Sequence, residues 1–270
     1  MDDMGSSHAA NAAGVDLFEK GIVTSCSVMI PGAYAYDFIR WWKDNQQFDT
    51  GIHFTLTCEW ENGKWRPVGD FTGTKSLWSP LQFMWQTNNE VIDHATPDDV
   101  YHELNAQIRL ALKWGLKPSH VDRHMYTVTL KDEFAQIYLR LAQQYDVSYL
   151  LHTNEVMPKS NYIPPGCNDS TRIGHNEVIR PVKSIDHQVG VPYDENMSLQ
   201  HKQDVLYDTI RNIKPGITLL TLHPVVDSPE IRYIIPDWKH RHDEYLIFMK
   251  DETLDVIKET GIDLIDYTFI

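Results

Sequence analysis

Residues 97–124 read PDDVYHELNAQIRLALKWGLKPSHVDRH, and this stretch predicts one complete α/β unit. Pro97 and the two aspartates after it are typical of a helix start, while Gly115 and Pro118 predict its end. Apolar residues recur every four positions along this helix, at Val100, Leu104, Ile108 and Leu112. A strand is expected to begin near Ser119, so a short turn connects the helix to the strand.

The rest of the chain repeats this alternation of strand and helix. Strands are expected over residues 22–30, 49–57, 147–151, 216–222 and 262–267, and helices over 6–21, 34–45, 131–145, 199–213 and 242–260. Two further stretches, 58–97 and 152–197, have weak periodicity and are expected to be long loops. This order predicts an α/β fold with a parallel sheet, open or closed into a barrel, and with functional side chains at the carboxyl ends of its strands.

Composition narrows the class of protein. The chain has 270 residues, 42% of them hydrophobic, which suits one domain over residues 1–270 with a large core. A formal net charge of -14 argues against a nucleic-acid partner. The three cysteines, Cys26, Cys58 and Cys167, fit reduced thiols in a cytoplasmic protein better than a disulfide framework. No apolar run long enough for membrane insertion and no signal-peptide pattern is present in the sequence.

His53 lies in the predicted strand segment GIHFTL, residues 51–56. Strand alternation puts Ile52 and Phe54 on one face and His53 on the other, away from the apolar layer. The side chain is therefore available to a ligand, although a hydrogen-bonded strand histidine explains the pattern equally simply.

The segment HVDRH, residues 120–124, contains two histidines and an aspartate that could bind a metal ion. In an extended chain His120, Asp122 and His124 share one side, so two imidazoles and a carboxylate converge. Neutral imidazoles bind divalent ions, and a nearby carboxylate commonly orients a ligating histidine. The alternative is a polar strand end that faces solvent.

Further candidate site residues lie at the N-terminus and in the last quarter of the chain. Asp2 and Asp3 precede the first predicted helix, where they either belong to a site or simply complement the helix dipole. His223 ends an apolar strand before Pro224, which makes the chain leave the sheet. Catalytic side chains gather at such strand ends in α/β folds, although an ordinary strand-end histidine explains this position equally well.

In order and spacing, these motifs resemble the YdjC-like carbohydrate deacetylases, also called the ChbG/HpnK type. The resemblance spans almost the whole chain and rests on DDMG at 2–5, GIVTS at 21–25, GIHFTL at 51–56, HVDRH at 120–124, HP at 223–224 and RHDE at 241–244. Several separate motifs in the right order are far more specific than any one alone.

The resemblance implies a distorted (β/α) TIM-like barrel and one divalent metal ion, Mg²⁺ or Zn²⁺, held by Asp3, His53 and His124. It also implies that Asp2 is the general base, and in this mechanism His223 is the candidate acid that protonates the leaving amine. Residues expected to orient these groups or the substrate are His120, Asp122, Arg241 and Glu244. Because only Met1 precedes Asp2, the family's first strand is expected to be absent or rebuilt by another segment.

The implied function is that of a metal-dependent hydrolase that removes acetyl groups from N-acetylated sugars, either monosaccharides or oligosaccharides such as chitooligosaccharides. Trp78 and Trp85, in the long loop, could stack on sugar rings or merely pack locally. Two other functions stay open: a non-catalytic carbohydrate-binding barrel, and a metal-dependent hydrolase of another bond such as a phosphoester. An unpaired strand edge would favour a homodimer.

Overall fold

Six strands, paired only in parallel, form two sheets in the computed structural model, which describes residues 1–150, 185–192, 194 and 196–269. The first sheet has the order β1 (Ser25–Val28), β2 (Asp49–Phe54), β3 (His120–Arg123), β4 (Ser148–Tyr149). The second pairs β5 (His187–Gly190) with β6 (Thr218–Thr221). The register sets His53 directly beside Asp122 on the neighbouring strand. The α/β class with a parallel sheet is thus confirmed.

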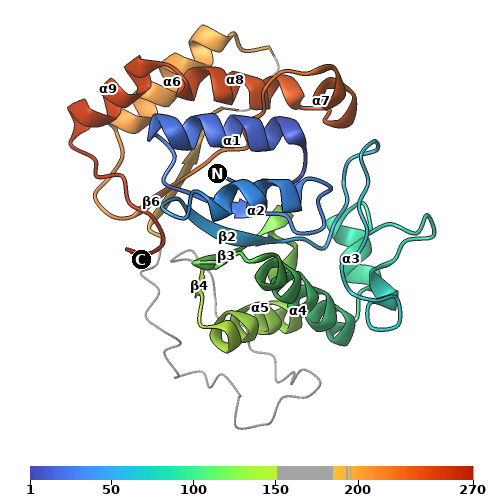
Figure 1. Cartoon of the computed structure of the whole chain (residues 1–270). Helices are drawn as coiled ribbons and strands as arrows, with labels where there is room; N and C mark the ends of the chain where they lie inside the picture. The colour runs from blue at the N-terminus through green and yellow to red at the C-terminus, as the bar shows by residue number, and fades with distance from the viewer. Residues whose placement is uncertain (151–184, 193, 195, 270) are drawn as a thin grey trace.

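Helices cover both sides of these sheets (Figure 1). Their bounds are α1 (His8–Lys20), α2 (Ala35–Lys43), α3 (Asn88–His94), α4 (Pro97–Trp114), α5 (Asp132–Tyr145), α6 (Leu199–Arg211), α7 (Pro229–Ile234), α8 (Trp238–Phe248) and α9 (Asp251–Thr260), with 3₁₀ turns η1 (Lys75–Leu77) and η2 (His124–Thr129). In Figure 1, α4 and α5 lie below β2 and β3, whereas α6, α8 and α9 lie above α1. None of the helices described is both long and apolar enough to cross a membrane.

Helix α4 forms where its sequence predicts, because both ends are capped. The Thr96 hydroxyl accepts from the Asp99 N–H, and Pro97 occupies the first turn, where no N–H partner is needed. Gly115 ends the helix in a left-handed conformation, with φ 95°. The four-residue repeat fails only at Leu112, which is 42% exposed, because a helix turns every 3.6 residues and Ala111 takes the buried position instead.

Residues 1–4 connect the two sheets. The Ser27 N–H donates to the Met1 carbonyl at 3.0 Å, and the Met4 N–H donates to the Ser27 carbonyl at 3.2 Å. On the other side, the Asp2 N–H donates to the Leu222 carbonyl at 2.9 Å. A short extended segment thus hydrogen-bonds to β1 and to the residue that follows β6, as a strand between them would. It places Asp2 and Asp3 at the same edge as the ends of β2 and β3, while closure into a barrel stays a prediction.

The expected elements near the C-terminus need two corrections. The predicted strand 262–267 is wrong: these residues form no strand, and Tyr267 instead stacks on the His120 ring with centroids 3.6 Å apart. The predicted helix 242–260 is two helices, α8 and α9, because the chain leaves helical geometry at Lys250. No glycine or proline marks this break in the sequence, so the sequence pattern did not reveal it.

Both predicted long loops contain regular structure. Residues 58–97 include α3, which begins with a reciprocal capping box between Thr87 and Glu90. Strand β5 lies within the expected loop 152–197, and residues 151–184 of that stretch are outside the described residues. The strand expected over 147–151 is shorter in the structure: β4 covers Ser148–Tyr149, residues 147 and 150 are not in a strand, and residue 151 lies outside the described residues.

Removing the Asp243 carboxylate is expected to destabilise the fold strongly. Asp243 Oδ2 accepts from Lys202 Nζ at 2.8 Å, and both side chains are buried. Asp243→Ala leaves a buried ammonium without its main partner, which costs roughly 3–5 kcal/mol. Thermal denaturation followed by circular dichroism measures the loss. The double variant Lys202→Met/Asp243→Leu removes both charges and should recover most of the stability that Asp243→Ala loses. An unchanged melting temperature in Asp243→Ala would contradict the prediction.

The same pair predicts a loss of stability in acid. Burial alone would raise the pKa of Asp243, but Lys202 and Lys239 hold it below its usual range. A carboxyl whose pKa is lowered by folding stabilises the native state above its unfolded pKa of about 4, and this contribution disappears as the pH falls further.

Candidate metal centre and active site

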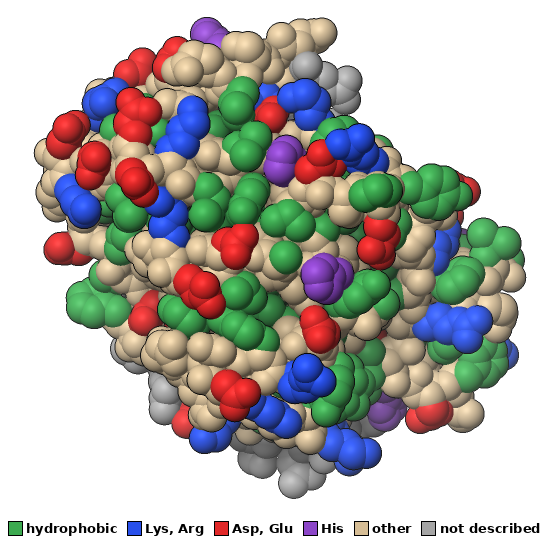
Figure 2. All heavy atoms as spheres, turned by 45° about the horizontal axis from the view of Figure 1, so that its top comes forward, with side chains coloured by type: hydrophobic (Ala, Val, Ile, Leu, Met, Phe, Trp, Pro, Cys, Tyr) green, Lys and Arg blue, Asp and Glu red, His purple; other side chains and the backbone are tan. Residues whose placement is uncertain are grey.

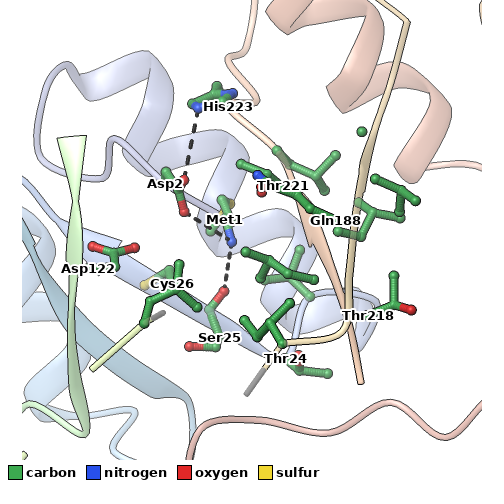
Figure 3. Close-up of a pocket in the computed structure, with 18 of the residues that line it drawn as sticks. Met1, Asp2, Thr24, Ser25, Cys26, Asp122, Gln188, Thr218, Thr221 and His223 are labelled. Carbon is green, nitrogen blue, oxygen red and sulfur yellow. Dashed lines mark hydrogen bonds and ion pairs between the residues drawn. The ribbon is translucent and has the colours of Figure 1, made fainter. Parts of the chain in front are cut away.

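A cavity of about 1410 Å³ lies between the two sheets. Its polar wall is built from the segments that end β2, β3 and β6 together with residues 1–3. The sequence-predicted residues that line it are Asp2, Asp3, His53, His120, Asp122, His124, His223, Arg241 and Glu244. Residues separated by more than 200 positions in the chain therefore meet at one site, as Figure 3 shows for Asp2 and His223.

Asp3, His53 and His124 form a compact buried cluster. One ligand atom from each lies within 4.8 Å of the others. Asp3 Oδ1 is 3.1 Å from His124 Nδ1 and 3.4 Å from His53 Nε2. A carboxylate oxygen and two imidazole nitrogens are a donor set that suits a divalent transition metal such as zinc, so the residues present fit the implied ion.

Arg241 fixes the Asp3 carboxylate. Its Nη1 donates to Asp3 Oδ2 at 2.6 Å, while its Nε donates to Asp237 Oδ2 at 3.1 Å. Burial alone would raise the pKa of Asp3, but Arg241 and His124 hold it well below its usual range. Asp3 is therefore ionised, with one oxygen bound by Arg241 and the other directed at the two histidines.

His53 is oriented by a buried carboxylate on the adjacent strand. Its Nδ1 lies 2.6 Å from Asp122 Oδ1, and the Ser27 hydroxyl donates to Asp122 Oδ2 at 2.7 Å. With Nδ1 donating to Asp122, the Nε2 lone pair faces Asp3. Asp122 thus has the orienting position that the sequence predicted for it.

His124 lies between two carboxylates. Its Nδ1 faces Asp3, and its Nε2 is 3.0 Å from both oxygens of Glu59. Burial alone would lower the pKa of His124, but Glu59 and Asp3 raise it to about 9. The electrostatic potential at this cluster favours positive charge, and the same potential favours a bound cation.

Glu59 was missed in the sequence. It stands beyond the predicted strand 49–57, in a tryptophan-containing stretch without periodicity, and no motif singles it out. The available signal was its position: an acidic residue two places after a strand that carries a candidate ligand.

Asp2 and His223 lie next to each other in the wall of the cavity (Figure 3). His223 Nε2 is 4.0 Å from Asp2 Oδ2, so the two side chains are close without a direct hydrogen bond. The His223 backbone N–H donates a hydrogen bond to Glu244 Oε2 at 2.7 Å, and this bond fixes the chain where it leaves the sheet. The His223 side chain is 38% exposed and so accessible to a ligand.

Asp2 also belongs to a second possible ligand group with His53 and Asp122. That group is the weaker candidate, because both Asp122 oxygens are already used, one by His53 and one by Ser27.

His120 lines the cavity but does not join the metal cluster. Its Nδ1 is 2.8 Å from the Ser119 hydroxyl, and its ring stacks on Tyr267. A side chain at Gly51 would come within 2.5 Å of this ring, so the glycine of the GIHFTL segment makes room for it. The alignment of His120 with Asp122 and His124 on one side therefore does not bring it to the site itself.

Trp78 and Trp85 do not line the cavity. Trp85 stacks on His94 at 4.2 Å and donates to the Ser76 carbonyl, while Trp78 donates to the Thr74 hydroxyl. Local packing, the alternative that the sequence left open, accounts for the positions of both rings, and stacking on a sugar stays a prediction. Two other tryptophans contact residues of the site. The Arg241 guanidinium lies 5.6 Å from the centre of the Trp60 ring, and the Trp65 ring lies 6.4 Å from the His124 ring.

Charged side chains are distributed over the face of the molecule that Figure 2 draws. On the face drawn in Figure 2, acidic and basic side chains are interspersed, and no extended basic patch covers that face. A nucleic-acid-binding surface would instead gather Lys and Arg together.

Several known proteins are similar to this chain. A carbohydrate deacetylase from Thermus thermophilus is 30% identical over 258 residues, covering 96% of this chain and 88% of that protein. One from Thermoanaerobacter pseudethanolicus is 21% identical over 270 residues, covering 100% of this chain and 96% of that protein. A chitooligosaccharide deacetylase from Salmonella paratyphi B is 27% identical over 157 residues, or 58% of this chain and 59% of that protein.

The fold is also found in a crystal structure from Enterococcus faecalis, of a protein for which cleavage of cellobiose phosphate has been suggested. It matches with a TM-score of 0.78 and 20% identity, over 99% of this chain and 95% of that one. The sequence profile described as YdjC-like protein matches residues 1–259, which include all the motifs quoted above. The resemblance seen in the sequence is confirmed, and this chain belongs to the YdjC-like protein family.

Proposed function

We propose that this protein is a metal-dependent hydrolase that removes acetyl groups from N-acetylated sugars. The observation that carries the proposal is the buried Asp3–His53–His124 cluster, with Asp2 and His223 beside it in one cavity. The names of its relatives, carbohydrate deacetylase and chitooligosaccharide deacetylase, support the class of reaction and an acetylated amino sugar as substrate.

Asp3, His53 and His124 would hold one divalent ion, Zn²⁺ or Mg²⁺. Such an ion supplies two effects when bound: it polarises an acetyl carbonyl, and it lowers the pKa of water. Three protein ligands leave further coordination positions for water and substrate, as catalytic zinc sites do.

The remaining steps belong to side chains of this chain. Asp2 accepts the proton of the attacking water, and His223, whose Nε2 lies 4.0 Å from Asp2 Oδ2, protonates the nitrogen of the leaving amine. Water adds to the acetyl carbon, the C–N bond breaks, and acetate and a free amino sugar are released. Arg241 keeps the Asp3 carboxylate ionised and oriented throughout.

Acetate release tests this proposal. Chelator-stripped protein is compared with protein resupplied with Zn²⁺ or Mg²⁺, using N,N'-diacetylchitobiose and N-acetylglucosamine as substrates. We expect release only with metal, because the polarised carbonyl and activated water are then available. Stoichiometric metal binding without release from any acetylated sugar would favour the binding-only function, and hydrolysis of a phosphoester in place of the amide would refute deacetylation. A cytoplasmic location and a homodimer stay predictions.

A further inference from the structure

Both histidines of the Asp3–His53–His124 cluster are bound on their far side by a carboxylate. Asp122 holds His53 through Nδ1, and Glu59 holds His124 through Nε2. We propose that Glu59 is a positioning residue that fixes His124 with its Nε2 protonated and its Nδ1 lone pair directed at the metal site. This inference rests on the metal site of the proposed function and assigns a role to a residue that no motif of the sequence marks.

The carboxylate of Glu59 is held in place by the loop that carries it. The loop begins where the Cys58 N–H donates to the Trp85 carbonyl at 2.8 Å, in a parallel bridge between Thr57 and Trp85. Trp65 fastens the same turn, because its indole N–H donates to the Thr57 carbonyl at 2.8 Å. The Glu59 side chain is only 19% exposed, so its contact with His124 is built into the fold.

The geometry also selects which nitrogen binds the metal. His53 reaches Asp3 through Nε2, whereas His124 reaches the same oxygen through Nδ1. A neutral imidazole has a lone pair on one nitrogen and a proton on the other. If the Nε2–H of His124 donates a hydrogen bond to Glu59, only Nδ1 has a lone pair for the metal. Rotation of the ring would break the contact with Glu59 and the contact with Asp3.

The expected contribution follows from similar sites. Carboxylates that orient a ligating histidine are worth about 10-fold to 100-fold in metal affinity. Glu59→Gln keeps the size of the side chain but loses the charge, and its amide accepts a hydrogen bond more weakly than a carboxylate. Metal affinity should therefore fall while the fold is retained.

The test is titration calorimetry of the chelator-stripped full chain with Zn²⁺. Glu59→Gln should weaken binding about 10-fold to 100-fold relative to the wild type. The matched control is Glu61→Gln, which removes the same charge from an exposed position two residues away. Its affinity should stay within about 2-fold, because exposed charges interact weakly through solvent. Circular dichroism and the melting temperature check that both variants fold.

A second readout addresses the tautomer directly. In ¹⁵N-labelled, zinc-loaded protein, nuclear magnetic resonance should show His53 bound through Nε2 and His124 bound through Nδ1 with a proton on Nε2. Coordination of His124 through Nε2 would overturn the inference, as would equal zinc affinity of Glu59→Gln and the wild type. A loss of affinity in Glu59→Gln as complete as in His124→Ala would also overturn it, because Glu59 would then be a ligand itself.

These outcomes separate the inference from the proposed function. If the wild type binds no zinc or magnesium, the metal site and the role of Glu59 both fail. If the wild type binds metal and releases acetate while Glu59→Gln is unchanged, only the role of Glu59 fails.

Discussion

His124→Ala is expected to abolish metal binding and acetate release together. His124 Nδ1 lies 3.1 Å from Asp3 Oδ1, and alanine removes one of the three donors that converge there. The substitution also leaves Glu59 buried without the imidazole that now accompanies it. Since loss of an orienting residue alone costs about 10-fold to 100-fold in affinity, loss of the ligand itself should cost more than about 100-fold. Calorimetry with Zn²⁺ and an acetate assay measure the two effects.

The matched control for this variant is His102→Ala, which removes an exposed histidine of α4. It should bind metal and release acetate like the wild type. Wild-type zinc affinity in His124→Ala would show that the ligand set is assigned wrongly, even if activity were lost.

Asp2→Asn is expected to keep the metal and lose turnover. Asparagine has the shape of aspartate but cannot accept the proton of the attacking water, and general base catalysis contributes roughly 10²-fold to 10⁴-fold. Asp2 is not part of the Asp3–His53–His124 cluster, so zinc affinity should change little. The measurement is kcat for acetate release at saturating metal, beside calorimetry on the same samples.

Asp93→Asn, an exposed carboxylate of α3, serves as the control for a lost negative charge. Full activity in Asp2→Asn would remove Asp2 from the role of base. A large loss of zinc affinity in that variant would instead place Asp2 among the ligands, with His53 and Asp122.

Local sequence determined many of the helices and strands, and the family resemblance supplied the candidate ligands Asp3, His53 and His124. Capping residues and the apolar repeat located α4, because helix ends and amphipathic faces depend on neighbours only a few positions away. The strand that contains His53 and the strand that ends just before His124 were likewise predicted from alternation and from motif order. Strand pairing then brought Asp122 to His53, as the two lie opposite each other in register.

The tertiary structure decided what depends on long-range contact. Glu59 and His124 are 65 positions apart, and Arg241 lies 238 positions from Asp3, so no local pattern linked these pairs. The false strand at 262–267 has the same origin: the segment is rich in apolar residues, but Tyr267 stacks on His120 and no neighbouring strand pairs with it among the described residues. Apolar content shows only that a segment could form a strand, because the hydrogen bonds that make a strand come from a partner elsewhere in the chain.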